Sequence, residues 1–171
     1  MGLNDIKLPA SLTTSFYRTT LVETGEYEPI EKPIVIEQPA PGEWKYLGDN
    51  KKNILIAVNY PGISHLPDEE LIFLTNILAA CKLDLGDIAI VNIANTTQAS
   101  YKDYYSFFKS KIIILFGIYP LSFGLPVDFP PFQVQSVAGS TFLHSPSLGE
   151  CRQDTLIKSK LWVCLRRIFG I

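Results

Sequence analysis

Short, continuous apolar runs recur along the chain from about residue 52 onward. Three of them begin at Asn53 ("NILIAV"), Asp87 ("DIAIVN") and Ile112 ("IIILFG"). Runs of this length that are apolar throughout are typical of parallel strands buried on both faces. The segment "FQVQSVAGSTFLHS", residues 132–145, predicts one or two further strands.

Three stretches between and after these runs have helical periodicity instead. We expect helices within residues 66–83, 100–111 and 152–170, because their apolar residues recur at intervals of three and four. Asp68 and Glu69 stand where the first helix begins, as the helix dipole favours. The expected inward-facing residues are Leu71, Leu74, Ile77, Leu78 and Cys81 in the first helix, Tyr104, Phe107 and Phe108 in the second, and Ile157, Leu161, Cys164, Leu165 and Ile168 in the third.

Alternation of strands and helices predicts an α/β fold. We expect a three-layer α/β/α sandwich around a mostly parallel four-stranded sheet, formed by residues 51–171. Residues 1–50 differ from this domain, because they carry several prolines and glutamates and have no long periodic run. They predict a partly extended N-terminal arm that could dock on a partner.

Charge and cysteine content narrow the range of functions. The 171 residues have a formal net charge of −2 and a pI near 5.7, without the basic surplus of a protein that wraps duplex DNA. Any contact with DNA would therefore use a local patch or a partner protein. The three cysteines lie far apart and form no CxxC pair, so no metal or other cofactor is expected.

The most apolar stretch of the chain does not predict a membrane helix. Residues 111–130 are interrupted by Pro120, Gly124 and Pro126, and they fall short of the roughly 20 clean apolar residues that a span requires. A buried strand followed by a loop fits them better. We expect no membrane association and a cytoplasmic location.

Polar side chains follow several of the predicted strands. Asn59, Asn92, Tyr119 and His144 come at or after the ends of successive strands, where α/β sheets bind ligands. Such residues also cap turns without any further role. His144 has the same two interpretations, since it could donate a hydrogen bond to a developing oxyanion or bond a loop carbonyl.

Common catalytic motifs are missing from the chain. There is no glycine-rich phosphate loop, no Ser in a G-x-S-x-G turn and no cysteine with a suitable histidine partner. Nucleotide hydrolysis, dinucleotide redox chemistry and nucleophilic hydrolysis are therefore set aside.

The C-terminal stretch "HSPSLGECRQDTLIKSKLWVCLRRI" resembles the psi subunit of bacterial DNA polymerase III. In that family a Ser-Pro-x-Leu loop precedes a Leu-Trp pair in the last helix. The resemblance covers about residues 52–169. The corresponding residues are Ser145, Pro146, Leu148, Leu161 and Trp162.

The psi subunit is itself similar in fold to the uracil-DNA glycosylases, which suggests a second set of roles. By that likeness Asn59 would hold the attacking water, Asn92 would read the uracil edge, and His144 would stabilise the leaving oxyanion. Tyr60, Tyr119, Ser145 and Ser147 would be binding residues around them. The Gly-Gln-Asp-Pro-Tyr-His motif is absent, however, and Phe73 is a poor substitute for the aromatic residue that stacks on the base.

The resemblance implies a non-catalytic, psi-like adaptor in DNA replication, with the glycosylase-type fold. Its partners would be clamp-loader or other replication proteins, and DNA only through a partner or a local patch. The alternative is a uracil-DNA glycosylase-like repair enzyme that acts through Asn59, Asn92 and His144.

Overall fold

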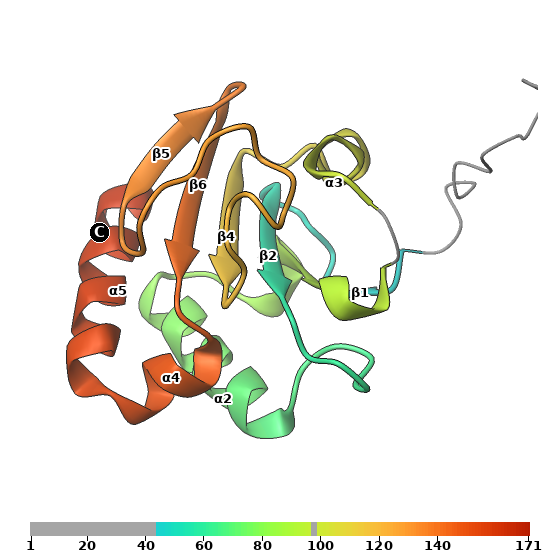
Figure 1. Ribbon diagram of the computed structural model, residues 1–171. Helices are drawn as coiled ribbons and strands as arrows, with labels where there is room; N and C mark the ends of the chain where they lie inside the picture. The colour runs from blue at the N-terminus through green and yellow to red at the C-terminus, as the bar shows by residue number, and fades with distance from the viewer. Residues whose placement is uncertain (1–43, 97–98) are drawn as a thin grey trace, which may run out of the picture. The chain divides into compact units, whose positions relative to one another are not determined.

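The computed structural model describes residues 44–96 and 99–171 of the chain. Most of the predicted N-terminal arm therefore lies outside the described residues. Within them, the chain forms an α/β unit built on one mixed sheet (Figure 1). The strands are β1 (Tyr46–Leu47), β2 (Ile54–Val58), β3 (Ile88–Asn92), β4 (Ile112–Phe116), β5 (Val134–Val137) and β6 (Ser140–Ser145). The α-helices are α2 (Asp68–Ala80), α3 (Tyr101–Phe108), α4 (Leu148–Gln153) and α5 (Thr155–Phe169).

The α/β class is confirmed, but the expected strand count is wrong. The sheet has six strands in the order β1-β3-β2-β4-β6-β5. The four inner strands are parallel, while β1 and β5 pair antiparallel at the two edges. Tyr46–Leu47 falls inside the segment predicted as an arm. With only two residues, β1 is too short to produce an alternating pattern in the sequence.

Apolar layers cover both faces of the sheet. On one face, Ile56, Ile90 and Leu143 pack with buried residues of α2, α4 and α5. On the other face, Leu55 and Phe142 pack with α3 and with buried residues of the long connection between β4 and β5. Figure 1 shows α2, α4 and α5 together on one side of the sheet and α3 on the opposite side. The layers follow from the period of two along each strand, which sends successive side chains to opposite faces.

The inward faces predicted for the first and last helices are confirmed. Leu74, Leu78 and Cys81 are buried in and just after α2, and Leu161 and Leu165 are buried in α5. The last helical stretch is divided in two at Asp154, between the end of α4 at Gln153 and the start of α5 at Thr155. The Asp154 carboxylate caps α5 by accepting a hydrogen bond from the backbone N–H of Leu156 (2.7 Å).

The prediction for α3 is wrong at one residue. Tyr104 and Phe108 are buried, but Phe107 is 44% exposed and lies against Trp44, with ring centroids 5.6 Å apart. Trp44 also lies 4.8 Å from Tyr104. The chain leading into β1 thus covers part of α3, and its aromatic residue gives Phe107 a partner outside the core.

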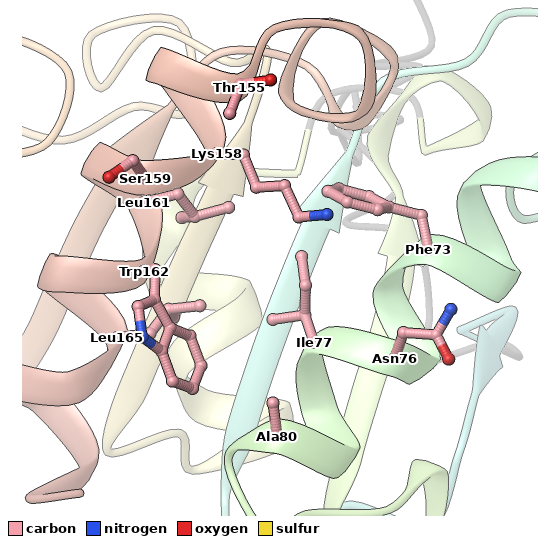
Figure 2. A pocket seen from close by; sticks show the side chains of 10 residues that line it. All are labelled: Phe73, Asn76, Ile77, Ala80, Thr155, Lys158, Ser159, Leu161, Trp162 and Leu165. Carbon is pink, nitrogen blue, oxygen red and sulfur yellow. The ribbon is translucent and has the colours of Figure 1, made fainter.

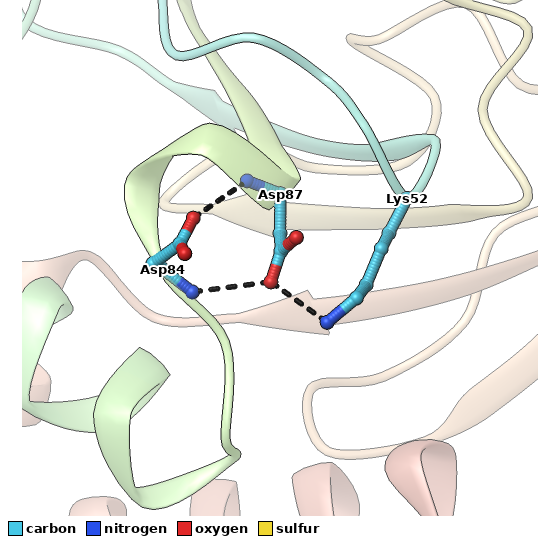
Figure 3. Close-up of polar contacts among 3 residues, drawn as sticks. All are labelled: Lys52, Asp84 and Asp87. Atoms are coloured by element: carbon cyan, nitrogen blue, oxygen red, sulfur yellow. Dashed lines mark hydrogen bonds and ion pairs between the residues drawn. The ribbon is translucent and has the colours of Figure 1, made fainter.

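A capped turn fixes the amino ends of β2 and β3. Asp84 begins a 3-10 turn by accepting a hydrogen bond from the backbone N–H of Asp87 (3.1 Å) and donating its own N–H to the Asp87 carboxylate (3.2 Å). Lys52, just before β2, donates to the same carboxylate at 2.8 Å (Figure 3). The Lys52 hydrogen bond is the main reason that the pKa of Asp87 lies below its ordinary value.

None of the helices in the described part of the chain is both long enough and apolar enough to cross a lipid bilayer.

Candidate functional site: the carboxyl edge of the sheet and the groove between α2 and α5

The four predicted strand-end residues do lie at the carboxyl edge of the parallel strands, but in different surroundings. Asn59 directly follows β2 and is exposed. Tyr119 lies in the loop after β4 and is 68% exposed. Asn92 ends β3 and His144 lies inside β6, and both are buried.

The amide of Asn92 is occupied by the loop that follows β2. Its Oδ1 accepts a hydrogen bond from the backbone N–H of Tyr60 at 2.9 Å. Its Nδ2 donates to the carbonyls of Tyr60 at 2.7 Å and Ile63 at 2.8 Å. Asn95 assists by donating to the carbonyl of Ile63 at 2.6 Å. Buried backbone groups require partners of this kind, so Asn92 has a structural use that engages both ends of its amide.

His144 packs between aromatic residues rather than in a polar loop. It pairs with Leu115 in the sheet, and its ring centroid lies 5.5 Å from that of Tyr119. Nδ1 lies 3.4 Å from the carbonyl oxygen of Phe129. The sequence placed His144 in the loop after the last strand, whereas β6 continues through it to Ser145.

The pleat of the sheet separates Asn92 from His144. Asn92 is two residues after Ile90 and shares its face, which is covered by α2, α4 and α5. His144 is two residues after Phe142 and shares the opposite face. In addition, β2 and β4 lie between their strands, which corresponds to about 14 Å at ordinary strand spacing. The structure therefore does not bring these two predicted catalytic residues together.

Three of the four predicted binding residues lie close to α4, whereas Tyr119 contacts His144. Tyr60 lies near α4, and its buried hydroxyl makes no hydrogen bond of good geometry with the described residues. Burial, followed by the negative charge of Glu70, raises the pKa of Tyr60 to about 12. The Ser145 hydroxyl is buried 3.4 Å from the thiol of Cys151. Ser147 caps α4, and its hydroxyl donates to the Glu150 carboxylate at 2.6 Å.

A metal site and a reactive thiol each set requirements for the thiols and acidic side chains of the described residues. Within residues 44–96 and 99–171, no group of three or more His, Cys, Asp or Glu side chains could hold a metal ion. Burial raises the pKa of Cys81, Cys151 and Cys164 above the ordinary thiol value. Each of these cysteines is thus predominantly a protonated, weakly nucleophilic thiol at neutral pH.

A feature not predicted from the sequence is an apolar groove of about 510 Å³ between α2 and α5 (Figure 2). The helix α4 packs against both of these helices and lies at one end of the space between them. Figure 2 shows Ile77 and Ala80 on one wall and Trp162 on the other. The groove is lined by Phe73, Asn76, Ile77, Ala80, Thr155, Lys158, Ser159, Leu161, Trp162 and Leu165.

Positive charge accompanies this groove. Lys158 reaches across it so that Nζ lies 5.5 Å from the centre of the Phe73 ring (Figure 2). The sequence of α5 contains Lys158, Lys160, Arg166 and Arg167 and no acidic residue. The wall formed by α2 has no charged residue between Leu71 and Ala80. Among the described lining residues, the charge is therefore that of Lys158.

Comparison with known proteins adds no relative. No protein-family model matches the chain, and no curated protein matches it.

Proposed function

We propose that this protein is a non-catalytic adaptor of the psi type, which joins a clamp-loader assembly to another replication protein. One observation carries the proposal. Leu161 and Trp162, the pair in the last helix on which the psi resemblance rests, both line the apolar groove. Leu161 is almost fully buried at its floor, while Trp162 is only partly buried. Large aromatic residues that remain accessible beside an apolar depression are characteristic of protein-binding surfaces.

The surroundings of the strand-end residues support an adaptor over an enzyme. Reading the edge of a base requires a free amide, and that of Asn92 already holds Tyr60 and Ile63. Stabilising the leaving base also requires His144 to face the same cavity, and the pleat directs it to the other side of the sheet. These residues have structural roles that need no substrate.

Fold similarity to the uracil-DNA glycosylases is part of the same proposal. The parallel inner strands, with helices on both faces, establish only the α/β class that such a similarity requires. The antiparallel strands β1 and β5 extend the sheet beyond the arrangement expected from the sequence.

A uracil-DNA glycosylase-like activity is the second candidate. The observation in its favour is the contact between His144 and the exposed ring of Tyr119 at the carboxyl edge of the sheet. An exposed aromatic ring beside a histidine could stack on a nucleobase.

Two measurements on the full chain test these functions together. The first is uracil excision from single-stranded and mismatched DNA by the wild type and by His144→Ala. We expect no excision by either protein. Excision by the wild type that His144→Ala abolishes would overturn the adaptor proposal and establish the enzyme.

The second measurement is association with purified clamp-loader proteins and a chi-type subunit, followed by sedimentation velocity. We expect the wild type to co-sediment with at least one of them. Trp162→Ala should weaken this association by about tenfold or more, as removal of a central aromatic anchor usually does. Val163→Ala is the matched control, because Val163 is the next residue of α5, is 63% exposed and does not line the groove.

A further inference from the structure

We infer that the groove between α2 and α5 receives one amphipathic helix of a partner protein, with apolar anchors on one face and acidic residues beside them. This inference rests on the proposed adaptor function, since it names the class of partner segment that the groove takes. The shape, the size and the charge of the groove each support this inference.

The spacing of the lining residues indicates a rod-shaped occupant. On α2, the groove is lined by Phe73, Ile77 and Ala80, at intervals of four and three residues. On α5, Lys158, Trp162 and Leu165 follow with the same intervals. Each wall is thus one face of a helix over about two turns, or roughly 10 Å. Two helical walls of this kind form the groove into which amphipathic helices dock through i, i+4 and i+7 anchors.

The volume of the groove fits several side chains. An apolar cavity of about 150 Å³ holds one benzene ring, so a groove of about 510 Å³ has room for roughly three anchors of that size. One helix presents that number of apolar side chains on one face over two to three turns. Ala80 adds to this space because its side chain is a single methyl group, which occupies little of the groove (Figure 2).

The charge at the groove indicates which polar residues the bound helix should carry beside its apolar anchors. Among the described residues that line the groove, Lys158 is the charged one, and its ammonium group lies over the ring of Phe73. Lys160 and Arg167 also belong to α5, but they lie about half a helical turn away from Lys158 and do not line the groove, and Lys160 Nζ lies 5.9 Å from the centre of the Phe132 ring. An acidic side chain next to the apolar anchors would pair with Lys158. A basic helix would bring like charges together, which costs affinity.

A nucleic acid fits the groove less well than an acidic helix does. The lining is mostly apolar, with a single cation, whereas strand-binding grooves track the phosphate backbone with several. The formal net charge of the chain is also −2. We therefore expect single-stranded DNA to bind this groove more weakly than an acidic helix does.

The experiment uses Trp162 as a reporter within the full chain. The chain has two tryptophans, so Trp44→Phe leaves Trp162 as the only one. The probe is a synthetic helical peptide of about four turns, with Leu and Phe at i, i+4 and i+7 and glutamates beside them. A second peptide has lysine in place of each glutamate, and a third has alanine in place of each anchor. Emission of Trp162 is followed during titration with each peptide and with oligo-dT.

We expect the glutamate peptide to shift and saturate Trp162 emission. The lysine and alanine peptides should each bind at least about tenfold more weakly. Ala80→Tyr, which fills the groove, should weaken binding of the glutamate peptide by about tenfold or more. Ala79→Tyr is its matched control, because Ala79 is the preceding exposed residue of α2 and does not line the groove. Lys158→Glu should weaken binding more than Lys160→Glu, which lies on the same helix outside the groove.

Several results would overturn the inference. They are failure of the glutamate peptide to bind, equal binding of the lysine peptide, an equal effect of Ala79→Tyr and Ala80→Tyr, and a response to oligo-dT alone. Self-association of the wild type that Ala80→Tyr abolishes would assign the groove to a second copy of this chain instead.

Association of the same variants with clamp-loader proteins separates the two proposals. If the chain binds those proteins and Ala80→Tyr has no effect on that association or on the peptide, the inference fails and the adaptor function stands. If the glutamate peptide binds at the groove and no replication protein does, the inference stands and the proposed replication role fails.

Discussion

At the scale of single residues, Asn92 is the clearest example of a polar group whose use depends on its neighbours. It is 2% exposed and hydrogen-bonds three backbone groups of the segment between β2 and α2. That segment has no regular secondary structure from Asn59 to Pro67, so its backbone groups need partners elsewhere. Asn92 is thus an anchor that fixes the path of the chain from β2 into α2.

Replacing this anchor should be costly. We expect Asn92→Ala to lower the free energy of unfolding by about 3 kcal/mol, because it removes three hydrogen bonds to partly buried backbone groups of Tyr60 and Ile63, at about 1 kcal/mol each. Asn95→Ala removes an exposed side chain that also donates to Ile63, and it should cost about 1 kcal/mol or less. Urea unfolding followed by circular dichroism measures both. Equal, small effects would contradict the anchoring role.

The sequence located these residues but could not assign their partners. The strand-end positions of Asn59, Asn92 and Tyr119 follow from the apolar runs that precede them, because a strand must end where such a run ends. The face to which Asn92 or His144 points depends on strand register, and its hydrogen bonds depend on the path of a distant loop. A single sequence encodes neither in a local pattern.

At the scale of elements, α4 shows how a short helix is held in place. Ser147 and Glu150 form a reciprocal cap, in which the Glu150 carboxylate accepts from the Ser147 N–H at 2.9 Å. At the other end of the helix, Arg152 forms an ion pair with Glu69 of α2. Helices of six residues are not stable alone, so these contacts and the buried Leu148 and Cys151 determine its position.

The cap of α4 makes part of the stability depend on pH. Hydrogen bonds from Ser147 hold the pKa of Glu150 below the ordinary glutamate value. The folded state therefore binds this proton less readily than the unfolded state does. The resulting stabilisation is present above the ordinary pKa of glutamate and is lost as the pH falls through the lowered value.

Ser147→Ala should reveal this contribution. We expect the variant to lose about 1 kcal/mol of unfolding free energy at neutral pH, and the difference from the wild type to narrow as the pH falls below about 4. Urea unfolding at a series of pH values measures the difference. Ser106→Ala, at an exposed position of α3, is the control and should show no comparable loss. A difference that grows toward acid would contradict the assignment.

Helices with long periodic patterns could be predicted from the sequence, whereas the contribution of irregular segments to the core could not. The inward faces of α2 and α5 follow from spacing alone. On the opposite face, Ile118, Phe123, Leu125 and Phe129 of the β4–β5 connection cover the sheet next to α3. Their sequence alternates apolar residues with prolines and glycines, which predicts a loop but does not indicate that the loop forms a layer of the core.

At the scale of the whole molecule, the sheet is covered on both faces by residues from position 44 onward. The two apolar clusters of the described residues include the inner strands, four helices and the β4–β5 connection. We therefore expect a chain that begins at residue 44 to fold and to unfold in one cooperative transition. Thermal unfolding followed by circular dichroism tests this.

Within the adaptor proposal, the shortened chain should also lose clamp-loader binding, which sedimentation velocity would measure. A shortened chain that fails to fold would count against the division between an N-terminal arm and a folded domain. One that folds and retains all clamp-loader binding would count against a docking role for the arm.

The groove could not be predicted from the sequence, because it depends on how whole helices pack against one another. Three of its ten described lining residues, Ile77, Leu161 and Leu165, were predicted to point inward. A groove arises where two helix faces are not fully closed over one another. That separation depends on how α4 positions α2 and α5, which is a property of tertiary packing.

The combination of cations and apolar surface on α5 has a kinetic consequence. Long-range attraction to the lysines and arginines of α5 would govern how often an acidic partner arrives, and dissolved salt screens it over about 8–10 Å. Contacts within the apolar groove would govern how long that partner stays, and they depend little on salt. Recruitment to this protein would then respond to ionic conditions, while the lifetime of the complex would be set by the fit of the anchors.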